Sequence, residues 1–388
     1  MISLEKLIKL LFIKFTFKSP PKAEVLIFDN ISSEEFKYAL KDLKYYTLNV
    51  RFEEIKIIYI SWQILFSFFK NIFTGLKISY LIALIKTVAP KIIITLEDNS
   101  FDFSKIAKIL NRRYIFIAVQ NSVRHFGQYR KLFEKKILNT NTNNLLFLPN
   151  YFCFGDHEVT DTKKENVVVK NYFPSGLLRL SNYIQFKKDN NIDVGKVKYD
   201  LALICENLES KTKLWKSEKF AQDIIKLFTY SIRAAINNKL KIKFILKSKK
   251  NKKNEINFYK KYLNIKEIKF FLENIIEQDR ESYQSYIAIE NSKVVAAFHS
   301  TMLIEKLALN GKILACNFTD EEIFNFPVDC FFRLIRPSYE EFENRLLKIL
   351  EFQDENYLKK IKKKLVASHE ELTHKIINTK IKKFLNDP

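Results

Sequence analysis

The stretch VVAAFHSTMLIEKLALNGKILACNF, from Val294 to Phe318, decides the fold class that the sequence predicts. An apolar and β-branched run over Lys293–Ala297 predicts a strand, because such residues fit a pleated, buried surface. The apolar spacing over Thr301–Leu309 predicts a helix, and a second apolar run over Lys312–Cys316 predicts another strand. Strand, helix and strand in this order form a crossover unit of a parallel sheet, so the stretch indicates an α/β protein.

The polar residues of this stretch predict an anion site. Ser300 or Thr301 caps the helix, and the amide groups of the first turn favour an anion such as a diphosphate. Glu305 lies four residues after Thr301 and faces the same side, where its carboxylate can accept hydrogen bonds from a sugar hydroxyl. His299, directly before the cap, could contact the phosphate. The plainer interpretation is that these residues only cap the helix, with Gly311 closing it.

The same alternation extends through the rest of the chain. Toward the N-terminus, strands are predicted at Ala23–Phe28, Tyr46–Phe52, Lys91–Leu96, Tyr114–Val119 and Tyr151–Phe154, with helices such as Glu34–Leu43 and Phe101–Leu110 between them. A polar segment at Lys187–Lys198 comes next. The pattern then restarts, with strands at Tyr199–Cys205, Lys241–Leu246 and Ile268–Leu272 and helices at Leu214–Asn237, Asn254–Tyr262 and Arg280–Ile289.

This pattern predicts two Rossmann-like α/β domains that face each other across a cleft. The N-terminal domain would cover residues 1–186 and the C-terminal domain residues 187–338. A helical tail over residues 339–388 could pack back on the N-terminal domain. Ligands of open α/β sheets bind outside the carboxyl ends of the strands, so the polar residues directly after each strand are the candidate site residues.

Composition and charge narrow the class of protein. The chain has 388 residues, is 47% hydrophobic and contains only six glycines, which excludes disordered and low-complexity classes. Its four cysteines are far apart, so neither a disulfide framework nor a zinc ribbon is expected. The net charge of +22 attracts polyanions, although an AT-rich codon bias toward lysine would explain about half of this excess. Arginine, which reads bases, is scarce, so no sequence-specific nucleic acid is expected as a partner.

Two apolar segments point to a membrane surface without spanning it. Over Met1–Phe17 a helical face of leucine, isoleucine and phenylalanine is flanked by lysines. That face is an interfacial anchor for an anionic membrane or an ordinary packed helix, and no signal peptide is expected. The segment Ile55–Val88 predicts two helices with a membrane-touching surface. Its longest charge-free run, Ile57–Phe69, is about 13 residues, short of the roughly 20 that a span needs.

Several short segments resemble those of one enzyme family. The segment His299–Lys312 resembles the donor-binding segment of GT-B glycosyltransferases, most of all those of bacterial capsule and lipopolysaccharide biosynthesis related to Kdo-transferase and glycerophosphotransferase-like groups. Other segments resemble the same enzymes in the same order: Gln120–Arg124, Phe154–His157, Pro174–Arg179, Phe244–Lys247 and Phe258-Tyr259. Two departures stand out, since Gln120-Asn121-Ser122 lacks a glycine and Lys247-Ser248-Lys249 lacks a proline.

The resemblance implies a sugar nucleotide on the C-terminal domain and an acceptor on the N-terminal domain. The donor and phosphate residues would be Glu206, Lys247, His299, Ser300, Thr301 and Glu305. The acceptor-side residues would be Gln120, Asn121 and Arg124, and the catalytic carboxylate would be Glu97, Asp98 or Asp156. For each of these residues a plain structural role, as a cap, a loop residue or a solvated side chain, stays open.

The same reading excludes other chemistries and leaves three functions. GxGxxG, GxxxxGK[ST] and GxSxG are absent, and no DxD pair or His/Cys spacing suggests a metal, so we expect no cofactor and a metal-independent enzyme. The first function is a cytoplasmic glycosyltransferase, peripheral to the inner membrane, that moves a sugar from a nucleotide-sugar to a surface-polysaccharide or lipid-linked glycan acceptor. The alternatives are a sugar-nucleotide epimerase on the same fold and a non-catalytic polyanion- or membrane-binding protein.

Overall fold

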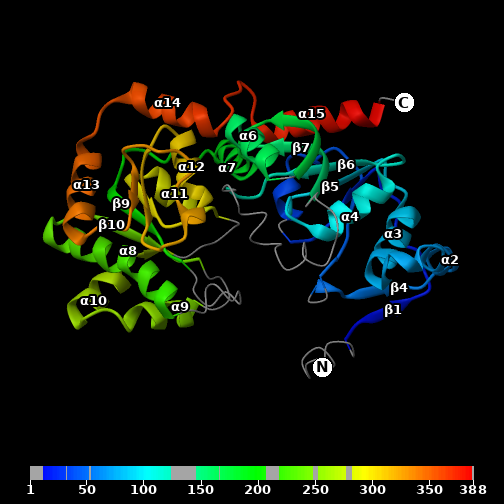
Figure 1. Ribbon diagram of the computed structural model, residues 1–388, viewed down its shortest axis with the longest axis horizontal. Helices are drawn as coiled ribbons and strands as arrows, with labels where there is room; N and C mark the ends of the chain where they lie inside the picture. The colour runs from blue at the N-terminus through cyan, green and yellow to red at the C-terminus, as the bar shows by residue number, and fades with distance from the viewer. Residues whose placement is uncertain are drawn as a thin grey trace. The chain divides into compact units, whose positions relative to one another are not determined.

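The chain folds into two compact units, each built on a parallel sheet (Figure 1). The computed structural model describes residues 12–31, 33–51, 54–123, 146–165, 167–206, 218–247, 252–276 and 282–386. Unit 1 takes the described residues within Met1–Asn121, Tyr129–Asn182 and Ala367–Pro388. Unit 2 takes those within Ser122–Gln128 and Tyr183–Val366.

The sheet of unit 1 has six strands in the order β3-β2-β5-β6-β7-β8, all parallel. The strands are β2 (Val25–Ile27), β3 (Tyr45–Thr47), β5 (Ile92–Thr95), β6 (Ile115–Val119), β7 (Leu146–Cys153) and β8 (Val167–Pro174). The unit's larger helices are α2 (Trp62–Lys70), α3 (Leu76–Val88), α4 (Phe101–Leu110), α6 (Asp156–Lys164), α7 (Leu178–Asp189), which continues into unit 2, and α15 (Thr373–Asn386).

Both faces of this sheet are buried, as the continuous apolar strands require. Along β2, Leu26 packs into one core cluster with residues of α3 and α4. Its neighbours Val25 and Ile27 point the other way into a second cluster, because successive strand residues face opposite sides. The second cluster includes Ile377 and Ile381 of α15, so the last helix of the chain packs on the sheet of the first unit.

The sheet of unit 2 has the strand order β11-β10-β9-β12-β13-β14, again parallel throughout. Its strands are β9 (Tyr199–Ile204), β10 (Ile242–Ile245), β11 (Ile275–Ile276), β12 (Ser292–Ala297), β13 (Lys312–Asn317) and β14 (Arg333–Ile335). Its helices are α8 (Glu218–Asn237), α9 (Lys252–Lys260), α10 (Ile265–Glu273), α11 (Gln284–Glu290), α12 (Thr301–Ala308), α13 (Tyr339–Glu351) and α14 (Glu355–Leu365). This order is that of the Rossmann fold, whose direction of winding reverses between β9 and β12.

The predicted fold class is confirmed: two Rossmann-like α/β domains with a helical C-terminal tail. The two helices predicted within Ile55–Val88 are confirmed as α2 and α3. No described helix is both long and apolar enough to cross a membrane.

Three local predictions were wrong, and some elements were not predicted. Residues Lys14–Thr16, predicted as the end of an N-terminal helix, form strand β1, which pairs with β4 (Ile57–Tyr59); residues 1–11 lie outside the described part. The predicted strand Ile268–Leu272 belongs to helix α10, whose capping box of Asn264 and Glu267 is a helix-start signal. The predicted helix at Glu34–Leu43 is only the 3-10 turn Ser33–Phe36. Strand β8 and helix α6 were not predicted at all.

Gly311 was expected to close α12 in the left-handed conformation, but Asn310 takes that position, with φ 59°. A Cβ on Gly311 would lie 2.1 Å from Cε and 2.5 Å from Cδ of Lys306. The Lys306 side chain is buried, and its Nζ donates to the backbone carbonyls of Ile289 at 2.7 Å and Ser292 at 2.6 Å. A side chain at position 311 would therefore have to displace the buried Lys306 side chain from these two carbonyls.

Lys306 makes the stability of the protein depend on pH in the alkaline range. Burial lowers the pKa of Lys306 to about 8, whereas an unfolded lysine titrates near 10.4. Between these values the unfolded chain holds a proton that the folded chain releases, so the contribution of Lys306 to stability rises with pH. We expect the unfolding free energy of wild type relative to a Lys306→Met variant to increase by up to about 3 kcal/mol from pH 8 to pH 10.5. Urea unfolding of both proteins across this range measures it, and a pH-independent difference would refute the assignment.

Candidate functional site

The reversal of winding in unit 2 brings together residues that follow three strands. Glu206 lies just after β9, Lys247 after β10, and His299 after β12. Lys247 Nζ donates to Glu206 Oε2 at 2.6 Å, and the backbone amide of His299 also lies against this carboxylate. Three of the predicted donor-side residues therefore meet at the edge where open α/β sheets bind their ligands.

Buried hydrogen bonds fix the backbone of Glu206 and of Lys247. The Tyr259 hydroxyl accepts from the Glu206 amide at 2.9 Å and donates to the Glu206 carbonyl at 2.8 Å. Glu255 accepts from the Lys247 amide at 3.1 Å. The Glu206 side chain is 5% exposed and that of Lys247 31% exposed. Burial raises the pKa of Glu206, while the Lys247 cation acts in the opposite direction.

The start of α12 borders a small, open pocket. Ser300 caps the helix, and its hydroxyl accepts from the Met302 amide at 3.3 Å. The His299 ring meets the Phe324 ring edge-on, with 5.5 Å between centroids. The pocket walls include Phe298, His299, Ser300, Leu303, Phe324, Phe326 and Pro327. An aromatic wall beside a helix N-terminus suits a ligand that joins a flat ring to an anion.

Thr301 and Glu305 differ in their access to solvent. Thr301 is half-buried at the first position of α12. Glu305 is 2% exposed, and its Oε1 accepts from the Tyr286 hydroxyl at 2.8 Å. Glu305 is thus engaged inside the unit, and a contact with a sugar hydroxyl would require it to share or exchange this partner.

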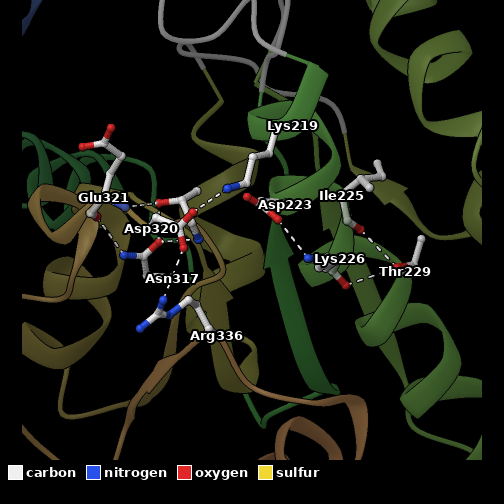
Figure 2. Close-up of polar contacts among 10 residues, drawn as sticks. Lys219, Asp223, Ile225, Lys226, Thr229, Asn317, Asp320, Glu321 and Arg336 are labelled. Atoms are coloured by element: carbon white, nitrogen blue, oxygen red, sulfur yellow. Dashed lines mark hydrogen bonds and ion pairs between the residues drawn. The ribbon is translucent and has the colours of Figure 1, made fainter.

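Two further cations of unit 2 lie after β9 and β14 in the chain. Figure 2 shows Lys219, from the start of α8, and Arg336, after β14, both reaching Asp320. The distances are 2.6 Å from Lys219 Nζ and 3.2 Å from Arg336 Nη1. The hydrogen bond from Lys219 lowers the pKa of Asp320. All three side chains are exposed, so two cations share one carboxylate at the surface of unit 2.

In unit 1 the direction of winding reverses between β2 and β5, and Glu97 lies there. Arg51 bridges two carboxylates, with Nε 2.9 Å from Asp29 Oδ2 and Nη2 3.0 Å from Glu97 Oε2. Asn121, predicted on the acceptor side, donates to Glu97 Oε1 at 3.3 Å. Glu97 is 17% exposed, so it combines a position at the carboxyl edge with partial access to solvent.

Asp98 points into the interior instead. It is fully buried, and its Oδ2 accepts from the Tyr151 hydroxyl at 2.9 Å. The same hydroxyl lies 3.3 Å from Glu158 Oε1, and Gln120 Nε2 donates to Glu158 Oε2 at 2.8 Å. Gln120 Oε1 accepts from the Phe154 amide at 2.7 Å. Asp98 and Gln120 therefore belong to one buried network, in which neither side chain faces solvent.

The remaining predicted residues are Asp156 and Arg124. Asp156 is exposed at the first position of α6, where the helix dipole favours a carboxylate. Arg124 lies outside the described residues. Within the described ranges, no three His, Cys, Asp or Glu side chains are grouped so as to hold a metal ion.

The sequence analysis missed several residues that hold the predicted site residues in place. Asp29 follows the predicted strand Ala23–Phe28, so its position carried the same signal as that of Glu97. Arg51 was predicted inside the strand Tyr46–Phe52, whereas β3 ends at Thr47. Tyr286 and Glu158 lie within helices α11 and α6, and nothing local marks them as partners of Glu305 and Gln120.

Comparison with known proteins shows the fold and leaves the family open. No protein-family model matches the sequence, and no curated protein does. Among solved structures, the wall teichoic acid polymerase TagF is 10% identical, with 98% of this chain and 93% of that chain covered at a TM-score of 0.54. A UDP-N-acetylglucosamine 2-epimerase from Rickettsia bellii is 13% identical, with coverages of 94% and 96% and a TM-score of 0.52. Given the two Rossmann-like sheets, this chain has the fold of GT-B enzymes.

Proposed function

We propose that this protein transfers a sugar from a nucleotide-sugar donor to a surface-polysaccharide or lipid-linked glycan acceptor, without a metal ion. The observation that carries the proposal is the site on unit 2. There Glu206, Lys247 and His299 meet at the reversal of winding, beside the aromatic pocket at the start of α12. TagF and the epimerases, which share the fold, are enzymes by name.

The chemistry follows from where charge develops. The bond between the anomeric carbon and the phosphate oxygen breaks, and the electron pair leaves with the nucleoside diphosphate. Lys247 and the amides at the start of α12 would stabilise this negative charge, and the pocket beside His299 would hold the base. Lys247 can move toward the phosphate only by loosening its contact with Glu206, so the ligand and Glu206 compete for one cation.

On this proposal a carboxylate on the acceptor side acts either as the base that takes the proton of the acceptor hydroxyl or as a nucleophile. A general base has to come within hydrogen-bond reach of that hydroxyl. Among the three candidates, Asp98 is fully buried, whereas Glu97 is partly exposed and Asp156 is exposed. We assign the base to Glu97, because it lies at the carboxyl edge and is held in place by Arg51 and Asn121.

Epimerisation of a nucleotide-sugar is the second candidate function. It is favoured by the epimerase from Rickettsia bellii and by a UDP-GlcNAc 2-epimerase from Neisseria meningitidis bound to UDP-GlcNAc. The latter is 12% identical, with coverages of 92% and 99% and a TM-score of 0.50. An epimerase would need the same donor site and no acceptor, so the two functions differ in their products.

Nucleotide-sugar binding tests the proposal directly. We expect at least one donor among UDP-, CDP-, CMP- and GDP-linked compounds to raise the melting temperature by a few degrees at 100-fold excess over its Kd. The free sugars serve as controls and should produce no shift. Transfer of the sugar to an added glycan or glycolipid identifies a transferase, and interconversion of the donor alone identifies an epimerase. If no nucleotide shifts the melting temperature while RNA or anionic vesicles bind, the protein is a non-catalytic polyanion binder.

A further inference from the structure

Unit 1 displays a row of large apolar side chains that its own core does not use. Trp62, Phe66 and Phe69 on α2 are 87%, 75% and 62% exposed. The row continues with Phe73, which is fully exposed in the turn η3 (Ile72–Thr74), and with Leu76 at the start of α3, which is 68% exposed. Within α2 the three aromatic residues are spaced by four and three positions, so they lie along one side of the helix. We call these five residues the aromatic stripe.

The aromatic stripe is separate from the face with which α2 packs on the protein. Ile64 of α2 is 1% exposed and belongs to the core cluster that also contains Leu81, Ile82 and Ile85 of α3. One side of the helix is therefore buried in the core, and the opposite, aromatic side faces solvent. Burying these side chains against a partner would be favourable by several kcal/mol. Exposed apolar rows of this size mark interaction surfaces.

Charge identifies the kind of surface that the stripe fits. The 34 residues of Ile55–Val88 contain four lysines and no aspartate or glutamate. Burial, together with the nearby cations Lys70 and Arg113, lowers the pKa of Lys86, so basic groups gather beside the C-terminal end of α2. Three exposed phenylalanines lie on the adjoining segment around β1: Phe12, Phe15 and Phe17. Lys14 and Lys18 are interleaved with them.

We propose that the aromatic stripe docks unit 1 onto an anionic lipid leaflet. Aromatic rings at the level of the headgroups supply apolar burial, and the surrounding lysines supply attraction to anionic lipids. A protein partner or a second copy of this basic chain would have to bring its own acidic surface, whereas an anionic bilayer provides one everywhere. The stripe would lie at the level of the lipid headgroups without spanning the bilayer. This docking does not depend on which reaction the protein catalyses.

Vesicle flotation tests this docking without any assay of activity. We expect wild type to float with phosphatidylcholine vesicles that contain 30% phosphatidylglycerol and to bind pure phosphatidylcholine vesicles at least about tenfold more weakly. The triple variant Trp62→Gln, Phe66→Gln and Phe69→Gln should lose binding to the anionic vesicles by at least about tenfold. Its melting temperature should stay unchanged, because all three side chains are exposed. Ile265→Gln, on α10 of unit 2 and 88% exposed, is the matched control and should bind as wild type does.

Fluorescence gives a second readout that locates the contact. The chain has two tryptophans, Trp62 and Trp215, so a Trp215→Phe background leaves Trp62 as the single indole. Its emission should shift to shorter wavelength on adding anionic vesicles, and lipids brominated near the headgroup should quench it. The proposal is overturned if the triple variant floats as wild type does, or if Trp62 stays solvent-exposed on bound protein. It is also overturned if the triple variant instead abolishes a dimer in vesicle-free solution.

Discussion

Replacing Lys247 by methionine should destabilise the protein by about 3 kcal/mol and lower turnover by about 10²–10³-fold. The stability loss follows because Glu206 is 5% exposed and would lose the cation bonded to its Oε2, so the buried carboxyl must either carry an uncompensated charge or take up a proton. On the proposed function, turnover falls because the same ammonium group would no longer stabilise the negative charge of the leaving diphosphate. Urea unfolding and the steady-state rate with the donor that stabilises the protein most would measure the two effects.

A second substitution separates these two effects. The double variant Glu206→Gln with Lys247→Met leaves no uncompensated charge, so it should recover most of the stability and none of the turnover. Lys243→Met, on the same strand β10, removes a lysine that donates to the Asn274 side chain at 3.4 Å and lies over the Tyr199 ring, and should change neither quantity much. A double variant as active as wild type would show that Lys247 serves only to neutralise Glu206.

Replacing Gly311 by alanine should cost about 2–4 kcal/mol of stability, a large effect for one methyl group. The new Cβ would overlap Cε and Cδ of Lys306, and the lysine would have to leave the carbonyls of Ile289 and Ser292. Gly311 is not among the residues with positive φ, so alanine fits its backbone and the cost comes from the collision.

Removing the lysine should remove the collision. In a Lys306→Ala background, Gly311→Ala is expected to be nearly neutral, so a double-mutant cycle should return a coupling energy of about 2 kcal/mol. Urea unfolding of the four proteins at pH 7 provides the cycle. Additive effects would mean that the glycine is required for its backbone and not for the passage of Lys306.

The sequence predicted the strand ends of the site better than it predicted the side chains around them. Glu206, Lys247 and His299 each follow a strand, and a parallel sheet places all carboxyl ends at one edge, so their meeting could be expected from strand order alone. Glu305 was expected to face a ligand because it lies one turn after Thr301. It contacts Tyr286 instead, because α11 packs against α12, and helix packing leaves no trace in local spacing.

Prediction from local sequence failed where one pattern of apolar residues is compatible with both a strand and a helix. The apolar residues Ile268–Leu272 fit a strand and a buried helix equally well, and the capping box before them was the deciding signal. Asp161 lies buried in the unpredicted helix α6, with its Oδ2 3.7 Å from His157 Nδ1, and only the packing of that helix reveals it.

The sequence by itself determined the two parallel sheets, because buried strands alternating with amphipathic helices are a short-range property that each segment carries alone. It also determined that the segment Ile55–Val88 is rich in aromatic residues and carries lysines but no aspartate or glutamate. Only the tertiary structure decided which charges are paired, which face of α2 stays exposed and which side chain passes over Gly311. These features depend on contacts between residues that are distant in sequence, and such contacts form only when the chain folds.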